Sequence, residues 1–547
     1  MRIVSREEMI AIDQESIKNR GIPGKTLMEA AGQAVFEELQ KRIQDKSQKI
    51  IIVCGKGNNG GDGFVLSKNL LKNDFNFDVF LLGEPSSLKG DAKWAYDEFN
   101  QLQGETFVLT PSNLESLKFS LEKTTWVVDG IFGTGLKTLK DKKEISFPFQ
   151  VISVLNEFKN RGGRVLAIDL PSGLDANHGL PVLDEKHCVI ADLTVTMGLA
   201  KMGCMQDPGE RFCGEVIVAN LPFPKDLIDS LDPPHIFITS EVISKNIQKR
   251  IATSHKGDYG HVVIIGGSKE MPGALLLAME GALRSGSGKV TAIVPGEDFP
   301  KKYASDQPEG MWFSVAADKK GYFAKESSLE VLAFLKNISE KKISVVFGPG
   351  ISKEDGPFEL FKTVLNLFEC QEPEFSLLID ADGLNLWAKY HPKEAMIPEK
   401  VLPLVLTPHP GECGRLMSMS SKEIQANRIQ AAINTQKTLN AWVILKGYRT
   451  LIAGPSTLDI NSSGNPGMAK GGMGDVLSGI LGARLAQINR INDENEIRHA
   501  LQTGIFIHGL AGDLVKKEMG EESLLPRDII SKLPQAFQQC LVLQDSK

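Results

Sequence analysis

The chain has 547 residues, which calls for two to four domains, because single hydrophobic cores stop growing near roughly 250–300 residues. Hydrophobic residues make up 42% and charged residues 24%, a balance that excludes intrinsic disorder, collagen-like repeats and a coiled coil. Its 62 basic and 68 acidic residues leave a net charge of -6, so we expect neither nucleic acid nor an acidic membrane as a partner.

The cysteines and the first residues bear on the compartment. Seven cysteines form no CxxC pair, and their odd number argues against a disulfide framework. The opening stretch MRIVSREEMIAIDQESI has no continuous apolar core, so it predicts neither a signal peptide nor a membrane-spanning helix. We therefore expect a cytoplasmic protein.

Short apolar, β-branched runs alternate with helical patterns along the chain, which is typical of parallel sheets covered by helices. The clearest runs are residues 49–53, 126–128, 165–168, 261–265 and 377–379. The predicted fold class is therefore α/β. Residues 220–235 contain four prolines and no clear period, so we place a domain boundary there, with domains at residues 1–228 and 229–547.

Near the start, residues 26–29 (TLME) have the pattern of a capping box that opens a helix. The first candidate site is GKGNNGGDG at residues 55–63, after a predicted strand and before a helical pattern that begins at Phe64. Such a turn exposes backbone N–H groups, to which a phosphate can come close. It matches neither the Rossmann fingerprint nor the P-loop. A tight turn in which Asp62 only caps the helix is the alternative. The density of Gly, Asn and Asp favours a site.

Two further strand ends supply carboxylates. Asp129 opens the glycine-containing loop DGIFGTGLK, and Asp169 opens DLPSGLDA. The carboxyl ends of strands in an open parallel sheet line the ligand crevice, so the three loops can converge on one pocket. Asp175, at the end of the last motif, is equally well explained as a turn former.

These three motifs, in this order, resemble the YjeF N-terminal domain, the epimerase of hydrated NADH and NADPH, from residue 1 to about residue 225. The resemblance implies a Rossmann-like three-layer sandwich, with Asp169 as the catalytic acid/base. It also implies a potassium ion held by Asn59, Asp129 and Ser172. The implied substrate contacts are Asn58, Asn59, Gly60, Gly61, Asp62, Gly133, Thr134, Gly135, Leu136, Lys137, Thr138, Leu139 and Asp169.

In the second half of the chain, polar residues again follow directly after the predicted strands. A strand ends at residues 266–268 (GGS), and a helix of small residues from 274 to 284 is expected to pack closely. VVFGPG, LIDADGLN and LTPHPGE follow, ending at residues 350, 385 and 412. His409 stands between two prolines in the last of these. That rigid loop favours ligand contact over the structural role usual for a lone histidine.

The strongest signal is GMAKGGMGDVLSG at residues 467–479. Gly471 to Gly474 offer backbone N–H groups, and a helix that starts near Asp475 points its positive end at the same place. A carboxylate beside such an anion hole suits phosphoryl transfer to a hydroxyl, because it accepts the proton while the N–H groups stabilise the transferring charge. A simple helix cap would not need three glycines in the four residues before Asp475. Residues 445–450 (LKGYRT) add a cation and a hydroxyl suited to a nucleotide phosphate.

From about residue 255 to about residue 510 these motifs resemble the ribokinase-like fold, and within it the ADP/ATP-dependent dehydratase of (6S)-hydrated NAD(P)H. The resemblance implies that Asp475 is catalytic, that ADP is the phosphoryl donor and that Mg²⁺ bridges its phosphates, although spacing alone indicates no Mg²⁺ ligand. Ser352 departs from the pattern, since glycine is common there. Implied nucleotide contacts are Lys446, Gly447, Tyr448, Arg449, Thr450 and Gly474; implied contacts with the hydrated dinucleotide are Ala274, Gly350, His409 and Asp475.

The resemblances together predict a bifunctional repair enzyme. The first domain would interconvert the R and S hydrates, and the second would phosphorylate the S hydroxyl from ADP and expel phosphate. Two alternatives remain: a ribokinase-like kinase that leaves a stable phosphorylated vitamin precursor, and a first domain that only binds ligands. The sequence does not distinguish ADP from ATP or NADH from NADPH, and relatives suggest a homo-oligomer.

Overall fold

The computed structural model describes residues 1–136, 146–230, 234–370, 374–390 and 403–545. The chain divides into two compact units, one of residues 2–235 and one that contains residues 236–547. The boundary predicted after residue 228 falls within the short helix α8 (Lys225–Asp229). Among the described helices, none is long and apolar enough to cross a membrane.

The first unit is built on a parallel sheet with strand order β4-β3-β2-β5-β6-β7-β9. The order reverses between β2 and β5, and a ligand crevice is expected at the carboxyl ends of these two strands. The strands of this unit are β1 (Arg2–Val4), β2 (Lys49–Cys54), β3 (Phe77–Leu82), β4 (Thr106–Leu109), β5 (Thr124–Gly130), β6 (Arg164–Ile168), β7 (Leu193–Met197), β8 (Ala200–Lys201) and β9 (Glu215–Ala219). Its helices are α1 (Arg6–Lys18), α2 (Gly24–Gln40), α3 (Asn58–Lys72), α4 (Gly90–Gln101), α5 (Leu114–Leu121), α6 (Phe147–Asn160), α7 (Gly209–Cys213) and α8.

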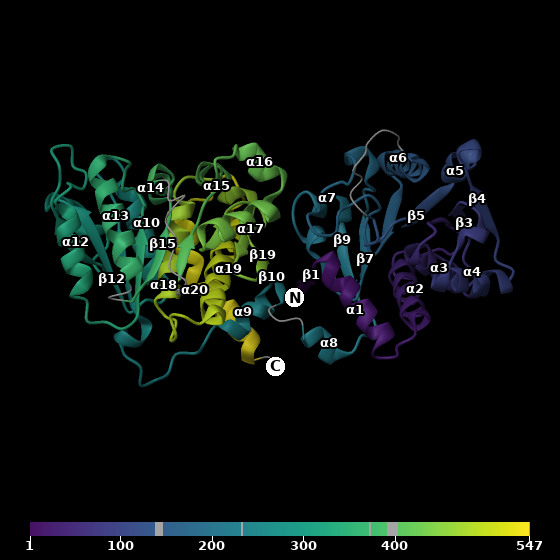
Figure 1. The fold of residues 1–547 in the computed structure, drawn as a ribbon, viewed down its shortest axis with the longest axis horizontal. Helices are drawn as coiled ribbons and strands as arrows, with labels where there is room; N and C mark the ends of the chain where they lie inside the picture. The colour runs from purple at the N-terminus through teal and green to yellow at the C-terminus, as the bar shows by residue number, and fades with distance from the viewer. Residues whose placement is uncertain (137–145, 231–233, 371–373, 391–402, 546–547) are drawn as a thin grey trace. The chain divides into compact units, whose positions relative to one another are not determined.

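Helices cover both faces of this sheet (Figure 1). Side chains alternate along a strand, so Ile50 and Ile52 of β2 pack with α2, α3 and α4, while Ile51 and Val53 pack with α5 and α6. The predicted three-layer α/β sandwich is confirmed.

The second unit has the strand order β13-β12-β11-β14-β15-β16-β17-β18-β19-β10, parallel except for the pairs β17–β18 and β18–β19. Its strands are β10 (His235–Ile238), β11 (His261–Ile265), β12 (Lys289–Pro295), β13 (Met311–Val315), β14 (Ile343–Phe347), β15 (Ser376–Ile379), β16 (Leu404–Leu406), β17 (Trp442–Leu445), β18 (Leu451–Ala453) and β19 (Leu458–Asn461). Its helices are α9 (Ser240–Asn246), α10 (Pro272–Arg284), α11 (Asp298–Tyr303), α12 (Ser327–Lys336), α13 (Asp355–Cys370), α14 (Asp382–Tyr390), α15 (Pro410–Met417), α16 (Ser421–Ala426), α17 (Arg428–Leu439), α18 (Met473–Leu485), α19 (Glu494–Met519) and α20 (Pro526–Asp545).

This sheet is also covered on both faces, by α9, α10, α18, α19 and α20 on one side and by α12, α13 and α14 on the other (Figure 1). Glycines bring α10 and α18 unusually close, because a Cβ on Gly479 would lie 1.9 Å from the carbonyl oxygen of Ala278. The expected close packing of the small-residue helix is therefore present. It fixes the start of α18 against the sheet.

Two local predictions are wrong. Helix α3 begins at Asn58 instead of Phe64, so the glycine-rich motif forms the first turns of the helix, and Asp62 lies inside the helix, where it cannot cap its start. Close contact explains why glycine is required there: a Cβ on Gly60 would lie 2.0 Å from the carbonyl oxygen of Gly55. Helix α2 begins at Gly24 with Pro23 as N-cap, so residues 26–29 form no capping box.

Candidate active sites

The first candidate site lies at the carboxyl edge of the first sheet, where β2, β5 and β6 end. Asn59 on α3, the loop after β5 and the residue after β6 meet there. A Cβ on Gly133 would lie 3.2 Å from Asn59 Oδ1 and 3.3 Å from Asp169 Oδ2. The structure thus brings the three predicted strand ends together.

Asp169 is held in place by a buried lysine. The Lys201 ammonium, 1% exposed, donates to Asp169 Oδ1 at 2.5 Å, to Thr196 Oγ1 at 3.1 Å and to the Met197 carbonyl at 2.9 Å. The same Oδ1 accepts from the Met197 N–H at 3.2 Å. Asp169 also has a φ of +65°, a strained conformation of the kind that clusters at functional sites. One carboxylate oxygen is therefore anchored, and Oδ2 faces Gly133.

Asp62 and Asp13 surround this ion pair with further carboxyl groups. Burial, followed by the charges of Asp169 and Asp13, raises the pKa of Asp62 well above its ordinary value. Burial raises the pKa of Asp13, on α1, to about 6, against the opposing charge of Lys201. Asp62 therefore favours its protonated form, and Asp169 is the carboxylate that pairs with a lysine. A carboxylic acid beside an ion-paired carboxylate is suited to supply an acid and a base.

Asp129, Ser172 and Asn59, the predicted potassium ligands, lie behind the loop after β5. Asp129 accepts from the Ser172 hydroxyl at 2.6 Å and from the Ser172 N–H at 2.8 Å. The Ser172 hydroxyl also lies 3.2 Å from the Phe132 carbonyl oxygen. The side-chain amide nitrogen of Asn59 is buried without a hydrogen-bond partner among the described residues. These are hard oxygen donors, with an unsatisfied amide beside them, and their chemistry fits a potassium ion.

The remaining predicted contacts of the first unit divide by exposure. Asn58 is exposed at the start of α3, whereas Gly61 is buried against Met28. The Thr134 carbonyl accepts from Arg6 Nε at 2.5 Å, which ties the loop after β5 to α1. Gly135 and Leu136 continue this loop in the described part of the chain; the predicted residues Lys137, Thr138 and Leu139 lie outside it.

The second candidate site is built around a buried ion pair at the carboxyl edge of the second sheet. Lys446 Nζ, after β17, lies 2.7 Å from Asp380 Oδ1, after β15, and 3.9 Å from Glu412 Oε2. The Ser478 hydroxyl of α18 donates to the other oxygen of Asp380. Gly474 lies beside the pair, since a Cβ there would be 3.4 Å from Lys446 Nζ and 3.8 Å from Asp380 Oδ2.

The charges of this cluster act on one another. Burial acts to lower the pKa of Lys446, but Asp380 and Glu412 outweigh it and raise that pKa. Burial acts to raise the pKa of Asp380, but the ammonium outweighs it and holds that pKa below its ordinary value. Burial and the charge of Asp380 raise the pKa of Asp475, in the first turn of α18, to about 7. Asp475 is thus the group of the cluster suited to exchange a proton near neutral pH.

The glycines before Asp475 start the helix as expected. Gly472 is the N-cap of α18 and has a φ of +89°, which favours glycine. The N–H groups of the first turn have no partner within the helix and point out of its positive end. The anion hole therefore adjoins Asp475, Lys446 and Gly474.

His409 has a structural role that the sequence did not predict. Its Nδ1 accepts from the N–H groups of Gly411 and Glu412, at 3.0 and 3.3 Å, and so caps α15. Burial, followed by the charges of Lys446 and Arg415, lowers the pKa of His409. The neutral ring then carries its proton on Nε2, which lies 3.5 Å from Glu412 Oε1. The cap fixes the ring, whose side chain is half exposed and open to a ligand.

Arg428 holds the predicted nucleotide loop, residues 446–450, through hydrogen bonds to backbone carbonyl oxygens. This guanidinium donates to the carbonyl oxygens of Tyr448 and Leu445 and approaches the position that a Cβ on Gly447 would take. Arg449 donates to the Ser462 carbonyl at 2.7 Å and lies 5.1 Å over the Tyr448 ring. The Thr450 hydroxyl donates to the Gly447 carbonyl at 2.9 Å. Tyr448, 54% exposed, presents an aromatic face at the surface.

Two predicted contacts with the hydrated dinucleotide also meet. A Cβ on Gly350 would lie 3.2 Å from the Cβ of Ala274, and Gly350 has a φ of +66°. Ser352, which stands where glycine is common, has a φ of +80°. Serine therefore occupies a backbone position that favours glycine.

Sequence reasoning did not assign several residues of the two clusters: Asp13, Lys201, Asp380, Glu412 and Ser478. Asp380 and Glu412 stood in motifs at strand ends, which was a usable signal. Lys201 is the only charged residue in the apolar stretch at positions 197–205 (MGLAKMGCM), a weaker signal. Among the described residues, no group of three or more His, Cys, Asp or Glu side chains could hold a metal ion.

Comparisons with known proteins show which families the chain resembles. A family model described as YjeF-related protein N-terminus matches residues 24–203, and one described as NAD(P)H-hydrate dehydratase matches residues 262–535. The bifunctional NAD(P)H-hydrate repair enzyme of Moorella thermoacetica is 34% identical over 98% of this chain and 96% of its own length. That of Coxiella burnetii is 35% identical over 94% of this chain and 95% of its own.

One solved structure is similar to part of this chain. It is the ADP/ATP-dependent NAD(P)H-hydrate dehydratase of Bacillus subtilis co-crystallised with ATP/Mg²⁺, which is 26% identical over 57% of this chain and all of its own, with a TM-score of 0.46. The full-length relatives settle the family that the motifs predicted. The chain belongs to the bifunctional NAD(P)H-hydrate repair enzymes, in which a YjeF N-terminal domain is joined to a dehydratase domain.

Proposed function

We propose that the first unit interconverts the R and S forms of hydrated NADH and NADPH, and that the second dehydrates the S form at the expense of ADP. The observation that carries the proposal is Asp475, a carboxyl group with a pKa of about 7 beside an anion-binding helix end and a lysine. A phosphoryl transfer to a hydroxyl needs these three parts.

In the first unit, Asp62 and Asp169 are the proposed acid and base. Asp62 donates a proton to the hydroxyl of the carbinolamine carbon, which departs as water. Water then adds to the other face of the ring, and Asp169 accepts its proton through Oδ2, the oxygen that faces Gly133. Lys201 holds the other oxygen, so we assign it as a positioning residue that keeps Asp169 a carboxylate. Asn58 to Gly61 and the loop from Gly133 line the bound substrate.

Potassium is proposed to be held by Asn59, Asp129 and Ser172, with the Phe132 carbonyl beside them. When bound, it would supply a fixed positive charge behind the loop after β5. The buried, unpartnered Asn59 amide supports this assignment, because a buried polar group without a partner is costly. Rotation of that amide would turn its oxygen toward the ion.

In the second unit, Asp475 is the proposed base. It accepts the proton of the S hydroxyl as that oxygen attacks the terminal phosphate of ADP. The N–H groups at the start of α18 and the Lys446 ammonium stabilise the transferring charge. Phosphate then leaves as the ring double bond forms, and AMP, phosphate and NAD(P)H are the products. Ala274, Gly350 and His409 orient the dinucleotide.

Lys446 to Thr450 and Gly474 are proposed to bind the nucleotide, with its base on the exposed Tyr448 ring. Magnesium would neutralise the donor phosphates, and Mg²⁺ is commonly held by one or two carboxylates together with substrate phosphates. Glu412, 3.9 Å from Lys446, is the carboxylate placed to hold it, directly or through water. The cytoplasmic location and the homo-oligomer stay predictions.

The decisive assay incubates the chain with S-hydrated NADH or NADPH and with ADP or ATP. We expect the dihydronicotinamide absorbance to return in step with AMP and phosphate when ADP is the donor. A stable phosphorylated product would favour the ordinary kinase, and no recovery with either nucleotide would refute the proposal. Asp169→Asn should stop R-to-S conversion; an unchanged rate would make the first unit a binding module.

A further inference from the structure

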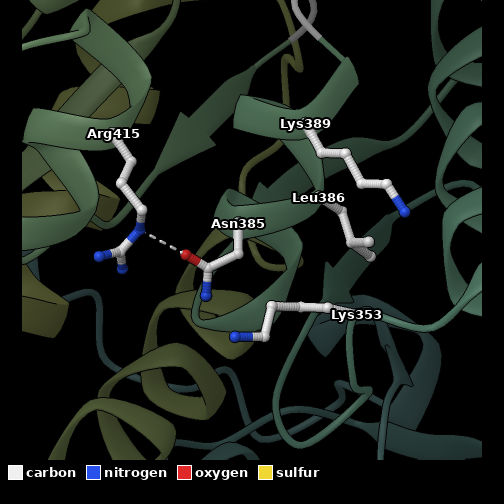
Figure 2. A pocket seen from close by; sticks show the side chains of 5 residues that line it. All are labelled: Lys353, Asn385, Leu386, Lys389 and Arg415. Carbon is white, nitrogen blue, oxygen red and sulfur yellow. Dashed lines mark hydrogen bonds between the residues drawn. The ribbon is translucent and has the colours of Figure 1, made fainter.

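The second unit has a cationic pocket, and Figure 2 shows the side chains that line it. It has a volume of about 350 Å³ and is lined by Lys353, Asn385, Leu386, Lys389 and Arg415. Lys353 follows β14, Asn385 to Lys389 lie on α14 after β15, and Arg415 lies on α15 after β16. These three strands are neighbours in the parallel sheet, so the pocket lies at the edge where ligands of such sheets bind.

Positive charge in this pocket is only partly compensated. Within the described residues the Lys353 ammonium makes no hydrogen bond or ion pair. Lys389 lies 4.8 Å over the Phe358 ring and 3.9 Å from Asp355, an exposed carboxylate. Arg415 donates its Nε to Asn385 Oδ1 at 2.7 Å, and among the described residues its terminal N–H groups make no hydrogen bond or ion pair, so they are open to a ligand. Asn385, which holds Arg415, also donates to Asp382 Oδ1 at 3.1 Å, so three cations and two carboxylates, Asp355 and Asp382, lie at the pocket among the described residues.

The pocket is continuous with residues assigned to the hydrated dinucleotide. A Cβ on Gly411 would lie 2.8 Å from the His409 ring and 3.9 Å from the Arg415 guanidinium. The charge of Arg415 is one of those that lower the pKa of His409. Gly350, on the same loop as Lys353, contacts Ala274. Arg415 therefore lies beside His409, and Lys353 follows Gly350 by three residues in the chain.

We propose that this pocket binds a phosphate of the hydrated dinucleotide, with Lys353, Lys389 and Arg415 as its ligands; the inference rests on the proposed function of the second unit. A dinucleotide carries a pyrophosphate, and NADPH carries a further phosphate on its adenosine ribose. The Arg415 guanidinium, which Asn385 holds in place, can donate two parallel hydrogen bonds to such phosphate oxygens, and the two lysines can pair with their charge. The phosphates of ADP are assigned elsewhere, at Lys446 and Gly474 beyond β16.

The test measures binding and turnover in Lys353→Ala/Lys389→Ala, with Arg415 retained because it contacts the His409 region. Fluorescence titration with NADPH and with NADH gives affinities that do not depend on dehydration. Assays with each S hydrate give KM and kcat, and the KM for ADP is measured in parallel. Lys336→Ala is the matched control, since Lys336 ends α12 just before β14 and so lies at the opposite edge of the sheet.

We expect the double variant to weaken dinucleotide binding by about tenfold, with the KM for ADP and the kcat unchanged. Weaker binding of NADPH alone assigns the pocket to the ribose phosphate, and weaker binding of both assigns it to the pyrophosphate. Unchanged affinity for both dinucleotides, or a raised KM for ADP instead, would overturn the proposal. A wild-type chain that binds NADPH through these lysines but repairs no hydrate would refute the proposed function and leave the phosphate site standing.

Discussion

The two sites use aspartate in opposite ways. In the first unit, Asp169 is locked by the buried Lys201 and held in a strained backbone conformation. In the second, the lysine is paired with Asp380, and Asp475 makes no ion pair or hydrogen bond through its carboxylate within the described chain. Both sites lie at the carboxyl edge of a parallel sheet beside a glycine-rich helix start. The two sites differ in which carboxylate pairs with the lysine: the proposed base Asp169 in the first, but Asp380 and not Asp475 in the second.

That difference follows the chemistry proposed for each unit. A reversible epimerisation needs an acid and a base in opposite protonation states, and a charged pair beside a buried Asp62 supplies them. Phosphoryl transfer needs one base near neutral pH, and burial together with the charge of Asp380 raises the pKa of Asp475 to about 7. We therefore propose that the two sites differ in which aspartate pairs with the local lysine, Lys201 or Lys446.

The largest expected effect comes from removing the unpaired base. Asp475→Asn should lower the rate of S-hydrate dehydration by about 1,000-fold, because general-base catalysis contributes about 10²–10⁴-fold. ADP binding, measured by calorimetry, should change little, and R-to-S conversion should be unaffected. Retained dehydration would remove Asp475 from its role.

The locked carboxylate gives the next largest effect. Lys201→Met should slow epimerisation by about 100-fold, because Asp169 loses the ion pair that fixes the orientation of its carboxylate. Removing one partner of a buried ion pair also costs about 3–5 kcal/mol of stability, so the melting of the first unit should be followed as well. Lys201→Arg keeps the charge and should recover part of the rate. If the Lys201→Met chain stayed folded and fully active in epimerisation, Lys201 would not be the positioning residue that distinguishes the first site from the second.

The pH dependence of the two activities should separate them. The base form of Asp475 is present above its pKa of about 7 and is lost as the pH falls. We therefore expect the dehydration rate to fall about tenfold per pH unit below pH 7 and to level off above it. Epimerisation needs the protonated Asp62, whose pKa burial raises well above its ordinary value, so its rate should not fall over the same range. Parallel profiles would contradict the account.

The smallest effect concerns backbone strain. Ser352 shares the left-handed conformation of Asp169 but has no assigned chemical role. Ser352→Gly should stabilise the second unit by about 0.5–1 kcal/mol, since a left-handed residue other than glycine costs about 1–2 kcal/mol and glycine recovers only part of it. Gly350→Ala is the opposite control, because its Cβ would lie 2.5 Å from the Met271 carbonyl oxygen. A destabilised Ser352→Gly chain would show that serine contributes contacts there.

Much of the architecture was readable from the sequence, because buried parallel strands are continuous apolar runs and their ends are marked by polar residues. The run at residues 261–265 matches β11. The start of α3 was missed because glycine and asparagine are weak helix formers, and only the contact of Gly60 with Gly55 shows why the helix begins there.

The partners of the site residues were harder to predict. Lys201 and Asp169 are 32 positions apart in the sequence, and Lys446 and Asp380 are 66 positions apart. No local pattern encodes such pairs, since they depend on which strands are neighbours in the sheet. The cap that His409 provides was missed because histidine is an uncommon N-cap. Motifs located the loops, but the protonation of each aspartate depends on the folded surroundings.

The central claim is that the two units are separate catalysts, and that each depends on one aspartate of its own. It is tested most directly with pure R-hydrated NADPH, ADP and the variants Asp169→Asn and Asp475→Asn. Each variant alone should fail to regenerate NADPH from the R form, and mixing the two should restore regeneration to near the wild-type rate. Asparagine suits the left-handed position of Asp169, but it leaves the buried Lys201 without its ion pair, so the melting of this variant is measured in parallel. If the mixture failed while Asp169→Asn still dehydrated the S form, or if either variant alone repaired the R form at the wild-type rate, the account would be contradicted.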